Sequence, residues 1–174
     1  SLYNEYGPTE ATVWSTVCHI KESEKPLTIG VPIPNVQIYV LDSDGGPVPV
    51  GVTGEIYIGG DGIARGYLNE PELTVERFLE NPFSSSPGGK MYRSGDMAYW
   101  LPNGSIVFVG RMDDQVKIQG RRIEPGEIET VLLQNDRIKK AVVTALPLEN
   151  GIHHLIGYVN AEEPISQEDI IGYL

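Results

Sequence analysis

The sequence predicts an α+β fold, and two observations predict it. Over roughly the first two thirds of the chain, short apolar and β-branched runs alternate with turns that contain Gly and Pro, which is typical of a small barrel or an open sheet. After Gly110 the pattern becomes strand, helix, strand, strand, helix, which favours a separate α+β lobe. The 174 residues, 40% of them hydrophobic, are enough for one large packed domain or two small ones.

The first part of the chain should be built mainly from strands. A run at 2–5 ends at Gly7–Pro8, because Gly permits a sharp turn and Pro fixes its own φ. The β-rich run at 11–20 predicts a half-buried strand, in which Trp14 has the character of a core residue. Clear strands follow at 36–41, before a turn signal at 44–46, and at 54–59.

A helix and a hairpin complete this part. The helix should cover 69–78, with Asn69 as its cap, Pro71 in its first turn, and Leu73 and Phe78 toward the core. An exposed, protease-sensitive loop is expected at 81–90, which is rich in Ser, Pro and Gly. The hairpin should cover 91–109, around a Pro-Asn-Gly turn at 102–104.

The run 59–66 contains four glycines and invites comparison with phosphate-binding loops. It does not match the dinucleotide fingerprint, because Arg65 stands where the third glycine is needed. It does not match the P-loop either, which needs Gly-Lys followed by Ser or Thr. We therefore interpret this run as a tight, crowded turn.

The second part should hold a strand at 115–119, an amphipathic helix at 125–134 and strands at 138–146 and 154–159. The apolar stripe of the helix is formed by Ile128, Val131 and Leu132, and the core face of the next strand by Ala141, Val142 and Val143. Ser166 should begin a last helix, since acids occupy the next turn. His153 and His154 are adjacent and point to opposite faces of a strand, so they do not predict a metal site.

Composition excludes several functions. A net charge of −11 and a pI near 4.6 speak against nonspecific nucleic-acid binding, and they mean that a nucleotide site needs local basic groups or a metal ion. A single cysteine, Cys18, excludes an internal disulfide framework and a thiolate zinc cluster. No apolar run reaches membrane-spanning length, and no signal peptide is visible. We expect a cytoplasmic protein that binds neither nucleic acid nor membranes.

Thr9 and Glu10 follow the Gly-Pro turn directly and have two interpretations. A hydroxyl beside a carboxylate suits a phosphate group and its Mg²⁺ ion, because hard oxygen ligands suit that cation. Thr9 also fits the N-cap of a helix that starts at Glu10, and spacing alone favours the cap.

Four segments, read together, change that balance: 1–10, 54–68, 92–96 and 110–124. In this order they resemble the adenylate-forming enzymes, and most closely the amino-acid adenylation domain of nonribosomal peptide synthetases, from Tyr3 to about Glu129. The resemblance implies that 1–112 form the β-rich, C-terminal end of the large lobe, as a distorted barrel or open sheet. It implies that 113–174 form a hinge and a truncated small α+β lobe.

The resemblance also implies the chemistry. ATP and an amino acid would give aminoacyl-AMP and pyrophosphate, and the aminoacyl group would then pass to a phosphopantetheine thiol on a peptidyl carrier protein. The residues implied for the nucleotide are Asn4, Tyr6, Gly7, Thr9, Asp96, Phe108 and Arg111, with Asn4 and Tyr6 at the adenine and Asp96 at the ribose. Glu10 would bind Mg²⁺, and Thr9, Glu10 and Lys117 would be the catalytic residues. Glu10 and Asp96 should therefore converge on one nucleotide.

Three further implications concern the amino acid and the second step. The positions that match the amino-acid pocket are Glu5, Val13 and Trp14, and a Trp there favours a small or flat substrate side chain. Asp113 matches the hinge about which the small lobe rotates, and Lys117 matches a strand that faces the site after rotation. Gly120 would let the pantetheine arm approach the backbone closely.

The match is incomplete. The family's phosphate loop and the aspartate that holds the substrate amino group would lie upstream of Ser1, and a catalytic lysine would lie after Leu174. Each missing electrostatic group costs on the order of 100-fold in rate, so we expect the chain alone to be inactive without the N-terminal part of the domain. Two alternatives stay open. The chain could be part of a stand-alone acyl or aryl acid ligase, although the runs 115–120 and 122–127 favour the peptide-synthetase branch. It could also be a non-catalytic module that binds a nucleotide or a carrier. The amino acid and the peptide product are not specified.

Overall fold

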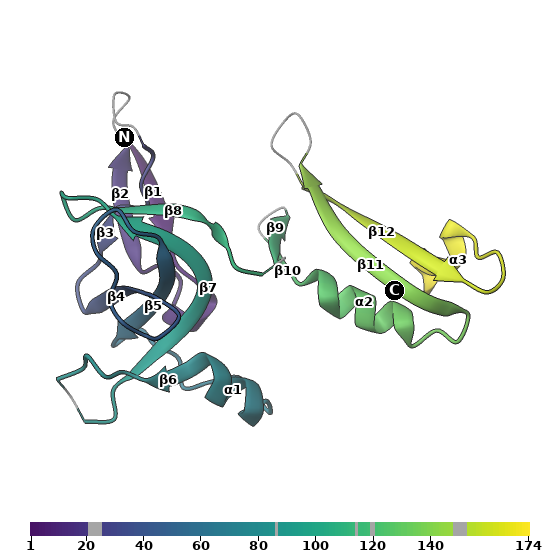
Figure 1. Cartoon of the computed structure of the whole chain (residues 1–174), viewed down its shortest axis with the longest axis horizontal. Coiled ribbons are helices and arrows are strands. Elements are labelled where there is room, and N and C mark those ends of the chain that lie inside the picture. The colour runs from purple at the N-terminus through teal and green to yellow at the C-terminus, as the bar shows by residue number, and fades with distance from the viewer. Residues whose placement is uncertain (21–25, 86, 114, 119–120, 148–152) are drawn as a thin grey trace. The chain divides into compact units, whose positions relative to one another are not determined.

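The computed structural model describes residues 1–20, 26–85, 87–113, 115–118, 121–147 and 153–174. They form two compact units, Ser1–Met112 and Asp113–Leu174 (Figure 1). Each unit combines strands with helices, so the α+β class predicted from the sequence is confirmed.

The described residues of the first unit form two antiparallel sheets. The larger has the order β4-β5-β7-β6, and β8 also pairs with β7; the smaller has the order β1-β2-β3. The strands are β1 (Leu2–Tyr6), β2 (Thr16–Ile20), β3 (Val31–Pro32), β4 (Val36–Leu41), β5 (Gly54–Gly60), β6 (Phe78–Glu80), β7 (Lys90–Trp100) and β8 (Ile106–Arg111). A 3₁₀ helix, η1 (Thr9–Ala11), and one α-helix, α1 (Pro71–Arg77), complete the unit.

The core of this unit lies on both faces of β5. Ile56 and Ile58 are completely buried and pack with Ile38 of β4 and Ile106 of β8. On the opposite face, Tyr57 packs with other buried side chains of β4 and β7. The alternating sequence of β5 therefore does not mark a half-exposed strand, because a central strand is covered on both sides.

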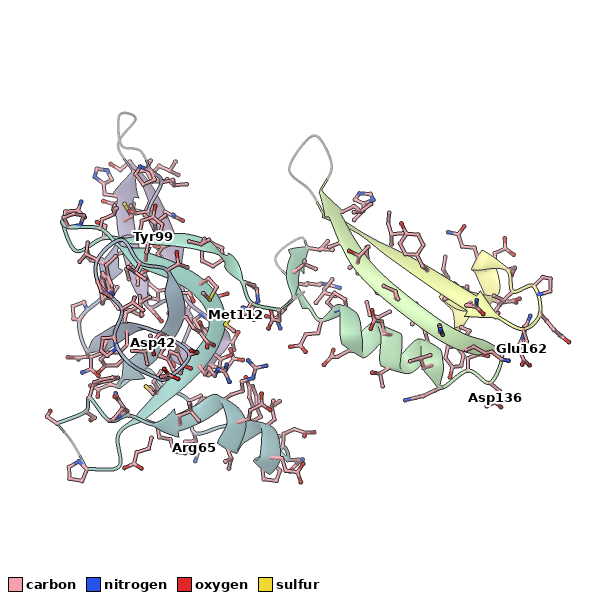
Figure 2. The ribbon with its side chains drawn as sticks, in the orientation of Figure 1. Asp42, Arg65, Tyr99, Met112, Asp136 and Glu162 are labelled. Carbon is pink, nitrogen blue, oxygen red and sulfur yellow. The ribbon has the colours of Figure 1, made fainter. Side chains whose placement is uncertain are left out.

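The predicted turns are confirmed. The Asp42 carboxylate, labelled in Figure 2, accepts hydrogen bonds from the backbone N–H groups of Asp44 (2.9 Å) and Gly46 (2.8 Å) and so closes the turn after β4. The β7–β8 hairpin is closed by Leu101, whose N–H donates to the carbonyl of Ser105 at 2.8 Å. Side-chain acceptors and glycines at these positions made both turns visible in the sequence.

The strand predicted at 11–20 is wrong in its first half. Thr12 and Val13 have φ angles of 55° and 73°, which no strand accommodates, and pairing starts only at Thr16. Trp14 is 39% exposed and is not a core residue.

The entry of α1 also differs from the prediction. Asn69 has a φ of 60°, and Glu70 takes the cap position without a side-chain cap bond. Pro71 is the first helical residue, as predicted. Phe78 is buried, but it lies in β6, and Leu73 is 38% exposed because a seven-residue helix buries little of its surface.

In the second unit, side chains of two helices pack against the longer of two strand pairs. Its elements are β9 (Val116–Ile118), β10 (Arg121–Ile123), α2 (Pro125–Leu133), β11 (Ile138–Pro147), β12 (His153–Ala161) and α3 (Gln167–Tyr173). Both strand pairs, β9–β10 and β11–β12, are antiparallel. Leu132, Ile138 and Val143 form the buried core.

The sequence predicted most of this unit. The cap at Ser166 is confirmed, since its hydroxyl accepts from the Asp169 N–H at 3.1 Å. Val131 (38% exposed) and Val142 (56% exposed) were wrongly assigned to the core. His154 is exposed, and the His153 side chain lies outside the described part of the chain.

Candidate functional site

The loop between β1 and β2 folds back on itself. The Ser15 N–H donates to the Tyr6 carbonyl at 2.7 Å, which brings the two ends of the loop together. A Cβ at Gly7 would lie 2.4 Å from the Cα of Trp14, so no other residue fits without displacing backbone. Gly7 is therefore explained by close packing within the loop.

Two residues of this loop have a strained backbone. Thr12 and Val13 are both β-branched and both left-handed, which is rare and costs on the order of 1–3 kcal/mol per residue. The Thr12 hydroxyl donates to the Gly62 carbonyl at 2.6 Å, and the Ala64 N–H donates to the Glu10 carbonyl at 2.8 Å. The glycine-containing run 59–66 thus holds the loop in place.

That run is the crowded turn that the sequence predicted. Gly60 has a φ of 110°, and a Cβ there would lie 2.1 Å from the carbonyl oxygen of Asn35. A Cβ at Gly66 would lie 2.3 Å from the Thr74 side chain. Its glycines are needed where the backbone approaches other atoms closely.

Thr9 is the first residue of η1, and its side chain is exposed. Pro8 takes the cap position, with no side-chain cap bond, so the interpretation of Thr9 as an N-cap is wrong. The 3₁₀ turn ends at once, because Thr12 is left-handed. The Thr9 hydroxyl is accordingly not engaged as a helix cap.

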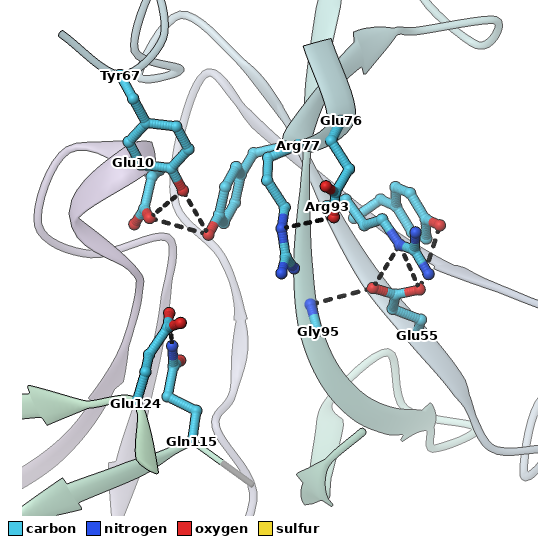
Figure 3. Close-up of polar contacts among 11 residues, drawn as sticks. Glu10, Glu55, Tyr67, Glu76, Arg77, Arg93, Gly95, Gln115 and Glu124 are labelled. Carbon is cyan, nitrogen blue, oxygen red and sulfur yellow. Dashed lines mark hydrogen bonds and ion pairs between the residues drawn. The ribbon is translucent and has the colours of Figure 1, made fainter. Parts of the chain in front are cut away.

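Glu10 is buried and held by two phenols. Its Oε1 accepts hydrogen bonds from the hydroxyls of Tyr67 (2.6 Å) and Tyr92 (3.0 Å), as Figure 3 shows for Tyr67. Burial and the bond to Glu10 raise the pKa of Tyr67, so this phenol stays protonated as a donor. The Glu10 carboxylate is thereby fixed in one orientation.

Asp96 forms a second buried carboxylate centre. The Tyr6 hydroxyl donates to Oδ2 at 2.5 Å, and Nη1 of Arg111 donates to Oδ1 at 2.6 Å. Burial, followed by the charge of Asp96, raises the pKa of Tyr6 well above its usual value. Arg111 supplies the positive charge that a buried carboxylate needs.

Two other predicted nucleotide residues, Phe108 and Asn4, differ in their contacts. The Phe108 ring centroid is 6.2 Å from that of Tyr6, and Phe108 is 40% exposed. Asn4 shares the Tyr6 face of β1, because alternate residues of a strand point the same way, but its amide donates to the Thr28 carbonyl at 2.7 Å. The structure thus groups Tyr6, Phe108 and Arg111 with Asp96, and it directs Asn4 elsewhere.

Asp96 lies in β7, and Glu10, which lies in η1, accepts a hydrogen bond from a residue of the same strand. Tyr6 bonds to Asp96, while Glu10, four residues after Tyr6, accepts from Tyr92, four residues before Asp96. Four residues of a strand span at most about 13 Å. Tyr92 and Asp96, the β7 residues at the two carboxylate centres, are therefore at most about 13 Å apart along the strand. That Glu10 and Asp96 converge on one nucleotide stays a prediction.

The predicted amino-acid pocket residues are all exposed. Glu5 points to the face of β1 opposite Tyr6. Val13 is 77% exposed and Trp14 is 39% exposed, and both belong to the strained loop. Strained, exposed side chains at a loop tip are typical of binding positions.

In the second unit, the Asp113 carboxylate accepts from the Gln115 N–H at 3.3 Å. The Gln115 amide in turn donates to Glu124 at 2.5 Å. Lys117 lies in β9, and its side chain, like the whole of Gly120, is outside the described residues.

Sequence reasoning missed Tyr67 and Tyr92, although both lie in segments that carried the resemblance. Nothing local to either residue indicates that its hydroxyl reaches a carboxylate 57 or 82 positions away. It also missed the ion pair between buried Glu55 and partly exposed Arg93, which crosses from β5 to β7. Such partners become visible only when the strand order is known.

Among the described residues, no group of three or more His, Cys, Asp and Glu side chains could hold a metal ion. A lone fixed carboxylate such as Glu10 nonetheless fits Mg²⁺, which is commonly bound by one or two carboxylates together with substrate phosphates and water. No helix in the described ranges is both long and apolar enough to cross a membrane.

The chain is similar to known proteins over its whole length. A family model described as AMP-binding enzyme matches residues 1–68. Tyrocidine synthase 3 of Brevibacillus parabrevis is 49% identical over 99% of the chain, and Gramicidin S synthase 2 of Aneurinibacillus migulanus is 47% identical over 100%. The chain spans only 3% and 4% of the length of these two relatives.

Solved structures agree. Holo-PA1221, a nonribosomal peptide synthetase protein with adenylation and PCP domains, matches 99% of the chain with a TM-score of 0.87 at 28% identity, and the chain covers 30% of it. AB3403, a four-domain nonribosomal peptide synthetase bound to AMP and glycine, matches 94% with a TM-score of 0.59 at 45% identity, and the chain covers 12% of it.

Proposed function

Since this chain belongs to the adenylate-forming, AMP-binding enzymes, with nonribosomal peptide synthetases as its relatives, we propose that it is part of an amino-acid adenylation domain. In the proposed reaction, an amino acid attacks ATP to give aminoacyl-AMP and pyrophosphate. The observation that carries the proposal is the pairing of Asp96 with Tyr6 and Arg111, together with the hydrogen bond that Tyr92, of the same strand as Asp96, donates to buried Glu10.

Asp96 is the proposed ribose ligand. Each of its carboxylate oxygens can accept about two hydrogen bonds, and each has one described bond, from Tyr6 or from Arg111. Acceptor capacity therefore remains for the two ribose hydroxyls. The partly exposed Phe108, beside Tyr6, offers an aromatic surface next to the same point.

Thr9 and Glu10 are the proposed phosphate-side residues. The exposed Thr9 hydroxyl can donate to a phosphate oxygen, and Glu10 is oriented by Tyr67 and Tyr92. Mg²⁺ would be held by Glu10 together with the phosphates, and when bound it would neutralise phosphate charge. Positioning and charge stabilisation carry phosphoryl chemistry of this kind.

The second half of the proposal is transfer of the aminoacyl group to a phosphopantetheine thiol on a peptidyl carrier. The presence of a PCP domain beside the adenylation domain in holo-PA1221 supports it. Asp113 is the proposed hinge, because it is the first residue of the second unit and a few torsions there would suffice for a rotation. Small-angle scattering with and without AMP would detect that rotation; an unchanged profile would contradict it.

The experiment that tests the function measures amino-acid-dependent ATP–pyrophosphate exchange by the synthetase that carries this chain. Asp96→Asn should lower exchange by about 100-fold, because it removes a charged ligand, while Asp61→Asn, in an exposed turn, should leave it unchanged. Exchange supported by aryl or fatty acids but by no amino acid would favour the acid-ligase alternative. AMP binding without any exchange would favour the non-catalytic module.

A further inference from the structure

Strand β7 contains a bulge immediately before Asp96. Arg93 pairs with Tyr57, and Met97 pairs with Glu55. Between these two pairs β7 advances four residues while β5 advances only two. Gly95, inside the bulge, has a φ of 76°, a conformation that favours glycine. The bulge takes the backbone of Gly95 and Asp96 out of the regular β5–β7 ladder, while Asp96 still pairs with Arg111 of β8.

Side chains satisfy the backbone groups that the bulge displaces. The Gly95 N–H donates to Oε1 of Glu55 at 3.0 Å, and the Asp96 N–H donates to the Ser94 hydroxyl at 3.0 Å. The Gly95 carbonyl accepts from the N–H of Met112 at 2.8 Å; Figure 2 labels this residue, which directly follows Arg111. One residue, Gly95, thus connects Glu55 of β5 to Met112, and Gly95 and Met112 flank the Asp96–Arg111 pair.

Glu55 itself is buried and firmly held. Nε of Arg93 donates to both of its carboxylate oxygens at 3.1 Å, and the Tyr57 hydroxyl donates at 3.2 Å (Figure 3). The hydrogen bonds to Glu55 raise the pKa of Arg93. Because the Arg93 side chain is 37% exposed, solvent screens the attraction between the two charges, and the ion pair alone is weak evidence of a stabilising role. The specific role of this pair follows from the hydrogen bond between Glu55 and the Gly95 N–H in the bulge.

We propose that Glu55, held by Arg93, is a positioning residue for Asp96. By binding the Gly95 N–H it fixes the bulge, and the bulge aims the Asp96 carboxylate at Tyr6 and Arg111. Glu55 would not contact the ligand itself and would act only through Gly95. The part of the proposal that concerns nucleotide affinity rests on the proposed function, whereas the part that concerns the bulge does not.

The first test needs no ligand. Hydrogen exchange should show the Gly95 and Met112 amides exchanging at least about tenfold faster in Glu55→Ala, since a bond of roughly 1.4 kcal/mol is lost. Glu55→Gln keeps an acceptor oxygen and should retain most of the protection. The exposed control Glu72→Ala should change neither amide. Unchanged exchange of the Gly95 amide in Glu55→Ala would overturn the proposal. If that variant does not fold, Arg93→Met, which removes the cation that holds Glu55, must show the faster exchange instead.

The second test separates positioning from general stability. Calorimetry with the whole protein should show that Glu55→Ala weakens AMP about tenfold but weakens 2′,3′-dideoxy-AMP less than about twofold, because the dideoxy compound lacks the hydroxyls that Asp96 would bind. Equal weakening of both ligands would overturn the positioning role. A wild-type protein that does not distinguish the two ligands would refute the proposed ribose contact instead, and the exchange test would still decide whether Glu55 fixes the bulge.

Discussion

The phenol of Tyr6 and the carboxylate of Asp96 are 90 positions apart in sequence and 2.5 Å apart in space. Their bond joins β1, in the smaller sheet, to β7, in the larger sheet. Two of the four segments that carried the family resemblance thus meet in one buried contact. The local geometry of each depends on the other.

The first prediction concerns this bond. Tyr6→Phe should lower the free energy of unfolding by about 1.5–3 kcal/mol, the range for a hydrogen bond to a charged group. The lower end is favoured because Arg111 still pairs with Asp96. Urea unfolding of the two proteins measures the difference. Tyr3→Phe, at a 56% exposed position, is the matched control and should have no effect; a Tyr6→Phe protein as stable as that control would show that the bond contributes nothing.

The second prediction concerns alkaline pH. Burial and neighbouring carboxylates raise the pKa of Tyr6, Tyr57 and Tyr67 in the folded state, whereas the unfolded value is about 10. Their stabilising contribution is therefore complete below about pH 10 and is lost progressively as pH rises from there toward the folded pKa values. The free energy of unfolding should fall steeply above about pH 10. The double variant Tyr6→Phe with Tyr67→Phe should make that fall in the free energy of unfolding less steep. If the phenolate absorbance shows that all tyrosines of the folded protein ionise near about pH 10, the prediction is contradicted.

The third prediction concerns the folded-back loop. Gly7→Ala should destabilise the protein by about 1–3 kcal/mol, the usual cost of overpacking, because the new Cβ would meet the Trp14 backbone at 2.4 Å. Gly126→Ala is the control, since no atom lies within 4 Å of its Cβ and α2 should gain from the better helix former. Thermal unfolding compares the two variants. Equal melting temperatures would mean that the loop relaxes without cost.

The elements that the sequence predicted well are those defined by local rules. Strand β4 was predicted at its observed bounds, because alternation and a flanking turn define both ends. The Ser166 cap followed from the acids in the next turn. In both cases the deciding interactions lie within a few residues.

The errors have a common physical cause. Thr12, Val13 and Asn69 are all left-handed, and tertiary contacts rather than propensity determine that conformation. Val131 and Val142 were assigned to the core from periodicity, which cannot show how much of a small unit's surface is covered. Candidate site residues were named from the resemblance, but the partners that hold them, Tyr67 and Tyr92, required the strand order.

The fourth prediction concerns the second unit. Oε1 of Glu129 accepts from the Val143 N–H at 2.7 Å, and this donor lies on the side of β11 away from its described partner, β12. Edge donors that are left unpaired in a partly buried place cost about 1–3 kcal/mol. Glu129→Ala should therefore destabilise this unit by that amount in urea unfolding. Glu127→Ala, on an exposed face of the same helix, should be close to neutral, and equal stability of the two variants would refute the edge contact.

The last prediction concerns substrate choice. If Trp14 lines the amino-acid pocket, Trp14→Ala enlarges that pocket without removing core packing, because the side chain is already 39% exposed. Pyrophosphate exchange by the synthetase should then shift toward larger amino acids by about 10- to 200-fold in relative specificity, the range for a change of pocket volume. Melting temperature should change little, and Leu68→Ala, at an 89% exposed position, should leave the preference intact. A wild-type preference for bulky aromatic substrates, or an unchanged preference in Trp14→Ala, would remove Trp14 from the pocket, because a Trp that fills the pocket has to exclude side chains of its own size.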